Sequence, residues 1–331
     1  MRVVSLGGWV LAPNDGKVCD VRFNPKARLD TRRVSDRGRG RSGGGSGVAL
    51  PGKAVGGGIG GVLIVVLFLV ATQILGDGTG GSGLPGGSLD TGRFSGEDTE
   101  RYANCRTGSD ANEDVDCARV AVENSLYDYW SETLPDQAGL TFQPERDVVT
   151  FSGGVATGCG NASSAVGPFY CPPDATIYLD TTFFRDVLDR QLNGPSGAFV
   201  EPYVLAHEYG HHIQNLTGAT DDVRTRQGPE SDAVRLELQA DCYAGMWAGR
   251  ATSTDDASGQ ALIANLTQDD IAQAVAAAKA VGDDRIQKAG SGRVDPEGWT
   301  HGSAAQRVRW FMTGYEQDSL EACDTFSASS L

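Results

Sequence analysis

VEPYVLAHEYGHHIQNLTG, residues 200–218, is the stretch that decides the fold, because it predicts a helix that carries a metal site. His207 and His211 are four residues apart, so both imidazoles lie on one helix face and can bind the same ion. Glu208 follows the first histidine and can reach a metal-bound water as general base. The alternative is two core histidines with a glutamate between them by chance, but three of the four histidines of the chain fall within six residues. The motif therefore predicts one catalytic zinc ion.

The helix face that carries these two histidines is expected to point into the protein. At about 100° per residue, Val200, Tyr203 and Val204 share the arc of the histidines. His212 points about 100° away from the ligand that precedes it, which favours a structural role. Gly218 is expected to end the helix.

A catalytic zinc ion needs a third protein ligand and an open position for water. The extended pattern H-E-x-x-H-x-x-G-x-x-H is absent, because Gln214 replaces the glycine and Thr217 replaces the last histidine. A carboxylate on a later helix is therefore expected to complete the site.

Glu237 and Asp241, in RLELQADCYAG, are the carboxylates that best meet this requirement. They are four residues apart on a stripe of small apolar side chains, where an unpaired charge would be costly. Zinc would satisfy Glu237, and the free ring N–H of a ligating histidine would satisfy Asp241. A buried salt bridge, for example to Arg235 or Arg250, is the alternative.

His301 is the histidine outside this cluster. It is a candidate to donate a hydrogen bond to the oxyanion of a tetrahedral intermediate. Tyr209 or Tyr178 could serve instead, and a place near Ser303 without any catalytic part fits the sequence equally well. The expected strand 176–180 could offer an edge to an extended peptide.

Charge divides the chain into two parts. Residues 1–53 hold 11 Lys and Arg against 4 Asp and Glu, a net charge of +7, and the remaining 278 residues carry −22. A nucleic-acid-binding domain would be basic, so the acidic main part disfavours that class of protein. Hydrophobic residues make up 40% of the chain, which disfavours a wholly disordered protein.

The uncharged segment Val55–Leu75 is long enough to cross a bilayer core of about 30 Å as a helix. Several arginines and Lys53 precede it, and the next charge after it is Asp77, which is the positive-inside pattern. A buried soluble helix and a cleaved signal peptide are the alternatives, and no small-residue cleavage site follows. The pattern predicts a single-pass protein of the cell membrane, with a cytoplasmic N-terminus and an extracytoplasmic catalytic domain.

Shifts in composition give the expected organisation. Residues 21–53 are expected to be a basic, disordered cytoplasmic segment. Residues 54–76 form the predicted anchor, residues 77–95 a Gly/Ser-rich linker, and residues 96–331 the zinc-dependent catalytic domain. The sequence does not indicate an oligomeric state.

Hydrophobic periodicity in the catalytic domain predicts an α+β fold that is mainly helical, with the first strands ahead of most helices. Thr267 and Asp270 resemble a capping pair at a helix start. Strands are expected over 140–151 and 176–180, and helices over 113–131, 181–192, 201–216, 231–249, 268–281 and 303–315.

Six of the seven cysteines follow the predicted anchor, in a compartment where disulfides persist, whereas Cys19 precedes it. We predict the bridges Cys105–Cys117, Cys159–Cys171 and Cys242–Cys323, because the first two close short local loops. A structural zinc site is the alternative, but the sequence has no C-x-x-C pair.

Several longer motifs, together with the Gly-rich anchor, resemble one bacterial family. They are RFNPKARLDTRRVSD, TGCGNASSAVGPFYCPPD, HEYGHHIQNLTG, RLELQADCYAGMWA, AVGDDRIQKAG and THGSAAQRVRWF. This set is similar to the putative neutral zinc metallopeptidase family, and the likeness extends from Val21 to about Tyr315. The resemblance implies a zincin-like fold and a membrane-anchored peptidase. The site residues it implies are the zinc ligands His207, His211 and Glu237, with Glu208 catalytic.

The resemblance also bears on where the protein begins. Members of the family usually begin M-R-F-N-P, whereas Val21 stands in place of the methionine here. We therefore expect translation to start at a valine codon at position 21, and residues 1–20 to be a mis-annotated extension.

The predicted function is a membrane-anchored zinc metallopeptidase that hydrolyses peptide bonds with a zinc-activated water and Glu208 as general base. Its expected partners are a peptide or protein substrate and the membrane, and no nucleic acid. The alternative is a zinc-stabilised, non-catalytic binding or scaffolding domain tethered to the membrane. Glu208 favours the enzyme, because a purely structural zinc site would not need it.

Overall fold

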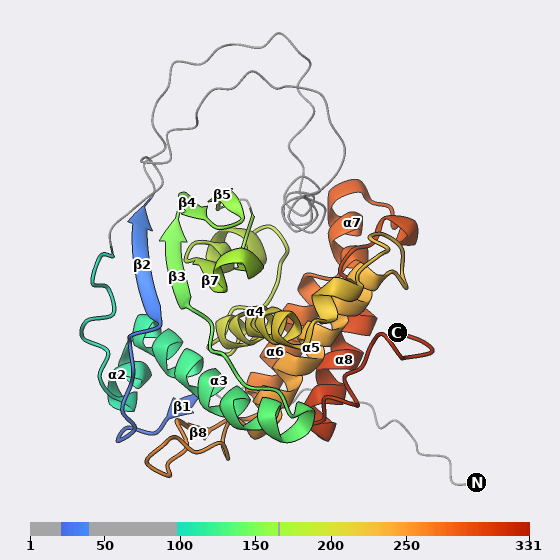
Figure 1. Cartoon of the computed structure of the whole chain (residues 1–331). Helices are drawn as coiled ribbons and strands as arrows, with labels where there is room; N and C mark the ends of the chain where they lie inside the picture. Colours follow the sequence, from blue (N-terminus) through green and yellow to red (C-terminus); the bar gives the residue numbers. More distant parts are fainter. Residues whose placement is uncertain (1–20, 40–97, 165) are drawn as a thin grey trace, which may run out of the picture.

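The computed structural model describes residues 21–39, 98–164 and 166–331. The main sheet has the strand order β2-β3-β7-β6, in which β2, β3 and β7 run parallel and β6 pairs antiparallel with β7. Figure 1 shows β2 beside β3, although more than 100 residues separate them in the sequence. The sheet strands are β2 (Val34–Arg39), β3 (Asp147–Ser152), β6 (Phe169–Cys171) and β7 (Thr176–Asp180).

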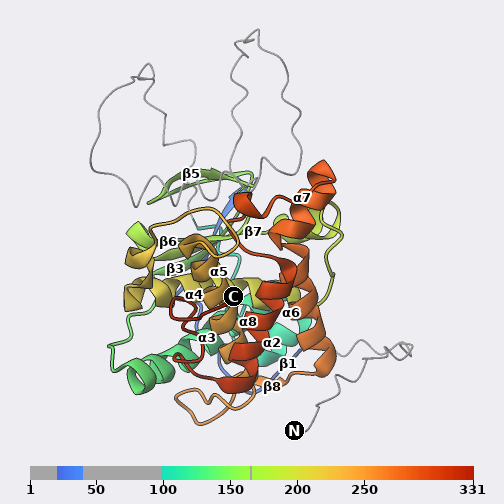
Figure 2. The same cartoon turned by 90° about the vertical axis from the view of Figure 1, so that its right-hand side faces the viewer.

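Two further strand pairs accompany the main sheet. A hairpin lies close to the sheet, and a short antiparallel pair joins the N-terminal segment to the C-terminal half of the chain (Figure 2). These strands are β4 (Gly154–Thr157) with β5 (Gly160–Ser163), and β1 (Arg22–Phe23) with β8 (Ile263–Asn265).

Helices pack on one side of the sheet and on one another (Figure 1). They are α2 (Gly108–Glu113), α3 (Val115–Ala138), α4 (Val200–Thr217), α5 (Asp232–Arg250), α6 (Gln268–Ala280), α7 (Asp283–Ser291) and α8 (Ala304–Gln317). A π-helix, η3 (Phe184–Asp189), precedes α4, and the short 3₁₀ turns are η2 (Pro172–Asp174), η4 (Ala219–Asp222) and η5 (Pro296–Gly298).

Small residues let three of these helices approach closely. A Cβ on Gly210 of α4 would lie 3.0 Å from backbone atoms of Ala240 in α5, and a Cβ on Gly314 of α8 would lie 1.8 Å from the carbonyl oxygen of Cys242. Only glycine fits at such separations. These two glycines therefore allow the polar faces of α4, α5 and α8 to meet.

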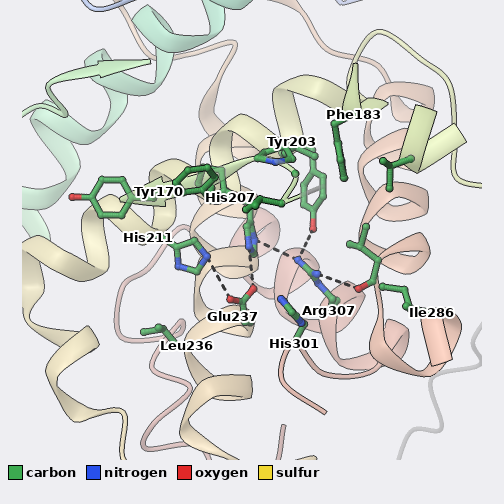
Figure 3. A pocket seen from close by; sticks show the side chains of 18 of the residues that line it. Tyr170, Phe183, Tyr203, His207, His211, Leu236, Glu237, Ile286, His301 and Arg307 are labelled. Atoms are coloured by element: carbon green, nitrogen blue, oxygen red, sulfur yellow. Dashed lines mark hydrogen bonds and ion pairs between the residues drawn. The ribbon is translucent and has the colours of Figure 1, made fainter. Parts of the chain in front are cut away.

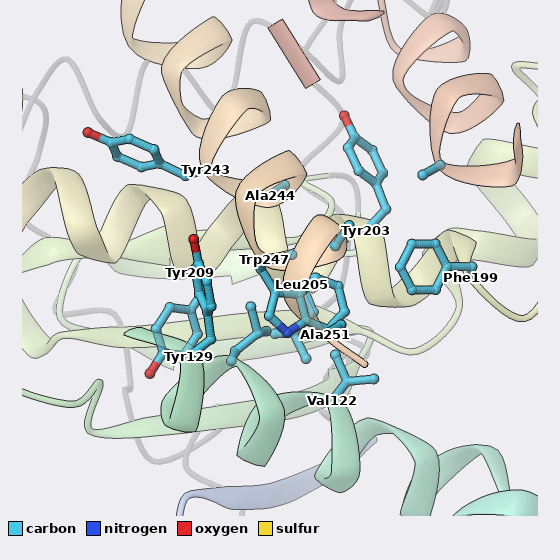
Figure 4. Packing of buried hydrophobic residues seen from close by; sticks show 14 of the residues in the cluster. Val122, Tyr129, Phe199, Tyr203, Leu205, Tyr209, Tyr243, Ala244, Trp247 and Ala251 are labelled. Carbon is cyan, nitrogen blue, oxygen red and sulfur yellow. The ribbon is translucent and has the colours of Figure 1, made fainter. Parts of the chain in front are cut away.

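The core contains two hydrophobic clusters that occupy opposite faces of the sheet. Alternate residues of β3 point to opposite faces, so Val148 enters the main cluster with α3 and α4, whereas Val149 and Phe151 enter a smaller cluster beneath the β4–β5 hairpin. In the main cluster, Trp247 stacks on Phe199 with ring centroids 5.7 Å apart (Figure 4). This packing holds α4 against α5.

Three disulfides join cysteines of the described residues, and they are the pairs that the sequence predicted. Cys105–Cys117 joins the segment before α2 to α3, Cys159–Cys171 joins the β4–β5 hairpin to β6, and Cys242–Cys323 joins α5 to the C-terminal tail. Cys19 lies outside the described residues.

The predicted fold class included a single N-terminal transmembrane helix, and that part of the prediction needs correction. In the described part of the chain, no helix is long and apolar enough to cross a membrane. The segment Val55–Leu75 lies outside the described residues, as do residues 1–20 and the predicted linker 77–95.

The prediction of a disordered cytoplasmic segment over 21–53 is wrong for residues 21–39, which are part of the fold. β2 pairs with β3, and the Asn124 side chain in α3 makes hydrogen bonds with the backbone of Asp30. Residues 21–39 and 98–331 therefore lie on the same side of any membrane, which conflicts with a single crossing between them. The folded domain therefore includes residues 21–39 and does not begin only at 96.

Several expected elements differ in extent. The strand expected over 140–151 begins only at Asp147, and the helix expected over 181–192 is the π-helix Phe184–Asp189. β7 lies between β3 and β6, so the expectation that residues 176–180 offer a free edge is wrong. The capping box of Thr267 with Asp270 is present, and Gly218 ends α4 with φ of 79°.

Candidate functional site

Three side chains from α4 and α5 converge on one point (Figure 3). His207 Nε2 lies 3.3 Å from Glu237 Oε2, and His211 Nε2 lies 3.6 Å from Glu237 Oε1. The three ligand atoms all lie within 4.8 Å of one another. Two imidazole nitrogens and one carboxylate are a donor set that zinc prefers, and three protein ligands leave a position open for water or substrate.

Asp241 fixes the orientation of His207. Its Oδ1 lies 2.9 Å from His207 Nδ1, which leaves Nε2 free to face Glu237. Arg307 of α8 donates to both carboxylate oxygens of Asp241, at 2.8 and 2.9 Å, and Tyr203 OH donates to Oδ1 at 2.6 Å. Burial alone would raise the pKa of Asp241, but the charges and hydrogen bonds of Arg307 and His207 together outweigh it and lower the pKa to about 2. Asp241 is therefore an ionised acceptor for the histidine.

His211 is held in a similar way by an amide. Gln214 Oε1 lies 2.8 Å from His211 Nδ1, and Gln214 Nε2 donates to the carbonyl oxygen of Leu236 at 2.6 Å. Since the amide nitrogen is committed to that carbonyl, the amide oxygen faces the histidine, and His211 carries its proton on Nδ1. Both histidines thus present Nε2 to the same point.

The electrostatics of the site favour a cation. Burial would lower the pKa of His207, but Asp241 and Glu237 outweigh this effect and raise it to about 10. The positive charges of the surrounding histidines hold the pKa of Glu237 well below its usual range, despite its burial. Asp241 and Glu237 therefore stabilise a positive charge at this point, and a bound divalent metal ion would supply that charge.

Glu208 is 7% exposed and lines the same cavity as the two histidines. Burial raises the pKa of its carboxyl, and the charges of His211 and His207 oppose the rise, as does the backbone N–H of Tyr170 in β6. A carboxyl group whose pKa is raised toward neutrality can both accept and return a proton.

His301 reaches the cavity from the segment between α7 and α8. Its Nδ1 lies 2.9 Å from Thr300 Oγ1 and 3.5 Å from Asp283 Oδ1, so Nε2 is the ring nitrogen left for the cavity. Burial would lower the pKa of His301, but the charges of Glu237 and Asp283 outweigh it and raise the pKa. Asp283 Oδ2 also accepts three backbone N–H bonds, from residues 300–302, which fixes this loop.

The other residues that the sequence singled out lie away from the metal ligands. His212 Nδ1 bonds Tyr170 OH at 3.0 Å and its Nε2 bonds the Gln143 carbonyl at 2.8 Å, and burial lowers its pKa to about 4, so its role is structural. Tyr209 lies in the core and Tyr178 OH donates to Asp174. Arg235 bonds backbone carbonyls of the C-terminal tail and Arg250 bonds Asp318, so neither pairs with Glu237 or Asp241.

Sequence reasoning missed the roles of four residues: Arg307 and Tyr203 as donors to Asp241, Gln214 as the partner of His211, and Asp283 as the partner of His301. Gln214 carried a signal, because it follows His211 by three residues and therefore shares its helix face. Arg307 and Asp283 belong to elements remote in sequence. The packing of α8 against α5 brings Arg307 to the site (Figure 3), and the packing of α7 against α8 brings Asp283 there.

The chain matches the family described as putative neutral zinc metallopeptidase over residues 24–326. An uncharacterized protein of Mycobacterium tuberculosis, Rv2575, is 52% identical over 229 residues, which cover 69% of this chain and 76% of that protein. The uncharacterized protein YpfJ of Escherichia coli K12 is 34% identical over 310 residues, which cover 91% of this chain and 99% of that protein. No solved structure matches the chain. The chain therefore belongs to the putative neutral zinc metallopeptidase family.

Proposed function

We propose that the protein is a zinc-dependent peptidase in which His207, His211 and Glu237 hold one zinc ion and Glu208 is the general base. The observation that carries the proposal is that the three ligand atoms of His207, His211 and Glu237 lie within 4.8 Å of one another. The buried carboxyl group of Glu208 lies beside them and is not needed as a metal ligand. The hydrogen bonds that Asp241 and Gln214 make to the two histidines support it, because metal-ligating histidines usually engage their second ring nitrogen in this way.

When bound, zinc polarises the scissile carbonyl and lowers the pKa of water toward about 7. Glu208 accepts the proton of the attacking water and delivers it to the leaving amine. His301, whose Asp283 partner favours the charged ring, donates from Nε2 to the developing oxyanion. Arg307 and Tyr203 act through Asp241, by keeping it ionised and aligned on His207.

The substrate is proposed to bind as an extended chain along β6. In the part of the chain that the structure describes, β6 pairs only with β7, and its Phe169 and Tyr170 line the cavity that contains Glu208. A peptide added to this edge would use main-chain hydrogen bonds for affinity, largely independent of its sequence. This assignment replaces the edge expected at residues 176–180.

The three disulfides support a proposal for the compartment as well. Such bridges persist in oxidising environments, so we place the folded domain outside the cytoplasm. Thiol labelling of protein taken from its native cells without reductant tests this. Labelling of the six paired cysteines would contradict the proposal.

The decisive experiment measures zinc content and cleavage of an unbiased peptide library for the wild type and for Glu208→Gln. The variant should keep its zinc and its fold while losing about 10²–10⁴-fold in kcat/KM, because it cannot move the proton. Glu316→Gln, the same change at an exposed position at the end of α8, is the control and should retain full activity. If the wild type binds zinc but cleaves no peptide that Glu208→Gln leaves intact, the protein is a non-catalytic zinc domain instead.

The third ligand is tested separately. Glu237→Ala should weaken zinc binding, measured by competition with a chelator, while circular dichroism reports an intact fold. Unchanged affinity would move the ligand elsewhere.

A further inference from the structure

A cavity of about 180 Å³ opens beside the metal centre, and its walls are mostly apolar. We propose that this cavity binds a large apolar side chain, phenylalanine or leucine, of the substrate residue that flanks the scissile bond. The inference rests on the proposed peptidase function and assigns the substrate class of the same site.

The apolar walls on the side away from β6 come from several separate elements. Phe183 and Val187 come from η3 and the residue before it, Val204 from α4, and Val281 and Ile286 from the end of α6 and from α7. Figure 3 shows Phe183 and Ile286 on the opposite side of His207 from His211. The apolar part of the cavity is therefore to one side of the ligands rather than around them.

The position of this pocket relative to the chemistry follows from α4. Val204 precedes His207 by three residues and Glu208 by four, so it lies one turn away on the adjoining helix surface. A peptide whose carbonyl lies at the metal ligands would thus place the side chain next to that carbonyl in contact with Val204. The pocket is close enough to select a residue that flanks the cleaved bond, and not a distant one.

The size of the cavity matches an aromatic or branched aliphatic side chain. An apolar protein cavity of about 150 Å³ is known to bind benzene, and the whole cavity here, including the space over His207, His211 and Glu237, has about 180 Å³. Phe183 is held in place by Gly167, whose φ is +80° and where a Cβ would lie 3.1 Å from the Phe183 ring. The backbone at Gly167 thus packs on the ring and keeps its other surface available to the cavity.

Charge within the cavity argues against a charged side chain. Arg307 is 4% exposed and its guanidinium is bonded to Asp241 through Nε and Nη2, so it is not available to a substrate carboxylate. Glu237 and Glu208 are assigned to the ligand set and to proton transfer. A substrate lysine or glutamate would therefore bury its charge without a partner, which is costly.

The test compares cleavage of fluorogenic peptides that differ only at the residue flanking the scissile bond, with phenylalanine, leucine, alanine, lysine or glutamate there. The zinc-loaded wild type should cleave the phenylalanine and leucine peptides at least about tenfold faster in kcat/KM than the alanine peptide, as expected for an apolar pocket. Val187→Phe narrows the pocket and should remove most of this preference, because it should lower kcat/KM for the phenylalanine and leucine peptides much more than for the alanine peptide.

Val294→Phe is the matched control, since Val294 is 45% exposed and lies outside the cavity lining. It should keep the wild-type preference. If Val187→Phe does not fold, Phe183→Ala replaces it, and this enlarged pocket should favour tryptophan over phenylalanine relative to the wild type.

The outcomes separate the two proposals. Cleavage without preference, or a preference that Val187→Phe and Val294→Phe change equally, overturns the pocket assignment and leaves the peptidase function standing. A zinc-loaded wild type that cleaves none of the peptides, and nothing in an unbiased library, overturns the peptidase function and the pocket assignment with it.

Discussion

Two adjacent arginines in the N-terminal segment, Arg32 and Arg33, are predicted to differ sharply in their contribution to stability. The Arg33 side chain is 16% exposed, and its Nε lies 2.7 Å from Glu123 Oε1 and 3.7 Å from Glu145 Oε1, two carboxyl groups with no exposed side-chain surface. The Arg32 side chain is 83% exposed and pairs with Asp30 at the surface. We compare Arg33→Met with Arg32→Met, which remove the same charge one residue apart.

The expected magnitudes follow from burial. Removing one partner of a buried ion pair costs about 3–5 kcal/mol, because the remaining charge stays buried and unpaired. Removing an exposed pair costs about 0–1 kcal/mol. Burial raises the pKa of Glu123 and of Glu145, so part of the cost can be avoided by protonation when the pH is low. Because the folded state then binds protons that the unfolded state releases, the stability of Arg33→Met should fall further as pH rises from 5 to 8.

The assay is equilibrium unfolding of the full chain in urea at pH 5 and pH 8, with the fluorescence of the buried Trp130 and Trp247 as signal. At pH 8, Arg33→Met should lose about 3 kcal/mol or more relative to the wild type, and Arg32→Met less than about 1 kcal/mol. Equal losses for the two variants would show that residues 21–39 do not pack on the domain. A difference between the variants that does not widen with pH would refute the account of the buried carboxyl groups.

Three further predictions concern the disulfides, an acidic side chain and the metal site. Replacing both cysteines of Cys242–Cys323 by serine should cost about 4.5 kcal/mol in the chain-entropy treatment, against about 2.8 kcal/mol for Cys105–Cys117, since the loops span 81 and 12 residues; an equal loss on urea unfolding would contradict this. Burial and the nearby Asp256 raise the pKa of Asp128 to about 7. Asp128→Asn should therefore stabilise the protein at pH 8 by about 1 kcal/mol after allowance for solvent screening. This gain should vanish below about pH 4, where Asp128 is protonated in both the folded and the unfolded state. Thermal unfolding at the two pH values measures this, and a gain that persists at pH 4 would refute it. Asp241→Asn should lower zinc affinity about 10–100-fold in a chelator competition, because the hydrogen bond to His207 loses its charge, and unchanged affinity would exclude that role.

The parts of the structure that the sequence predicted well depend on local spacing. His207, His211 and Glu208 were placed by the periodicity of a single helix, and Asp241 by its distance of four residues from Glu237 on the next. Two of the three disulfides close 12-residue loops, so proximity in sequence was enough to pair them. These relations need no knowledge of how elements pack.

The parts that were missed depend on contacts between distant elements. Composition over residues 21–53 indicated disorder, because the glycines and serines after residue 39 dominate the average, whereas Phe23 and Val34 are buried in the core. The order of strands in the sheet cannot be read from their order in the chain, which is why 176–180 was expected at an edge. Arg307 reaches Asp241 only because Gly314 allows α8 to approach α5 closely.

The pairing of β2 with β3 has a consequence for synthesis of the protein. Asp36 and Thr150 share a hydrogen bond although they are 114 residues apart, so β2 leaves the ribosome long before its partner exists. At about 5–20 residues per second, the N-terminal strand waits about 6–23 s for β3 to be made. Parallel pairing over such a separation is intrinsically slow to form. During that interval both edges of the strand are unpaired, and binding by a chaperone would protect them until β3 is made.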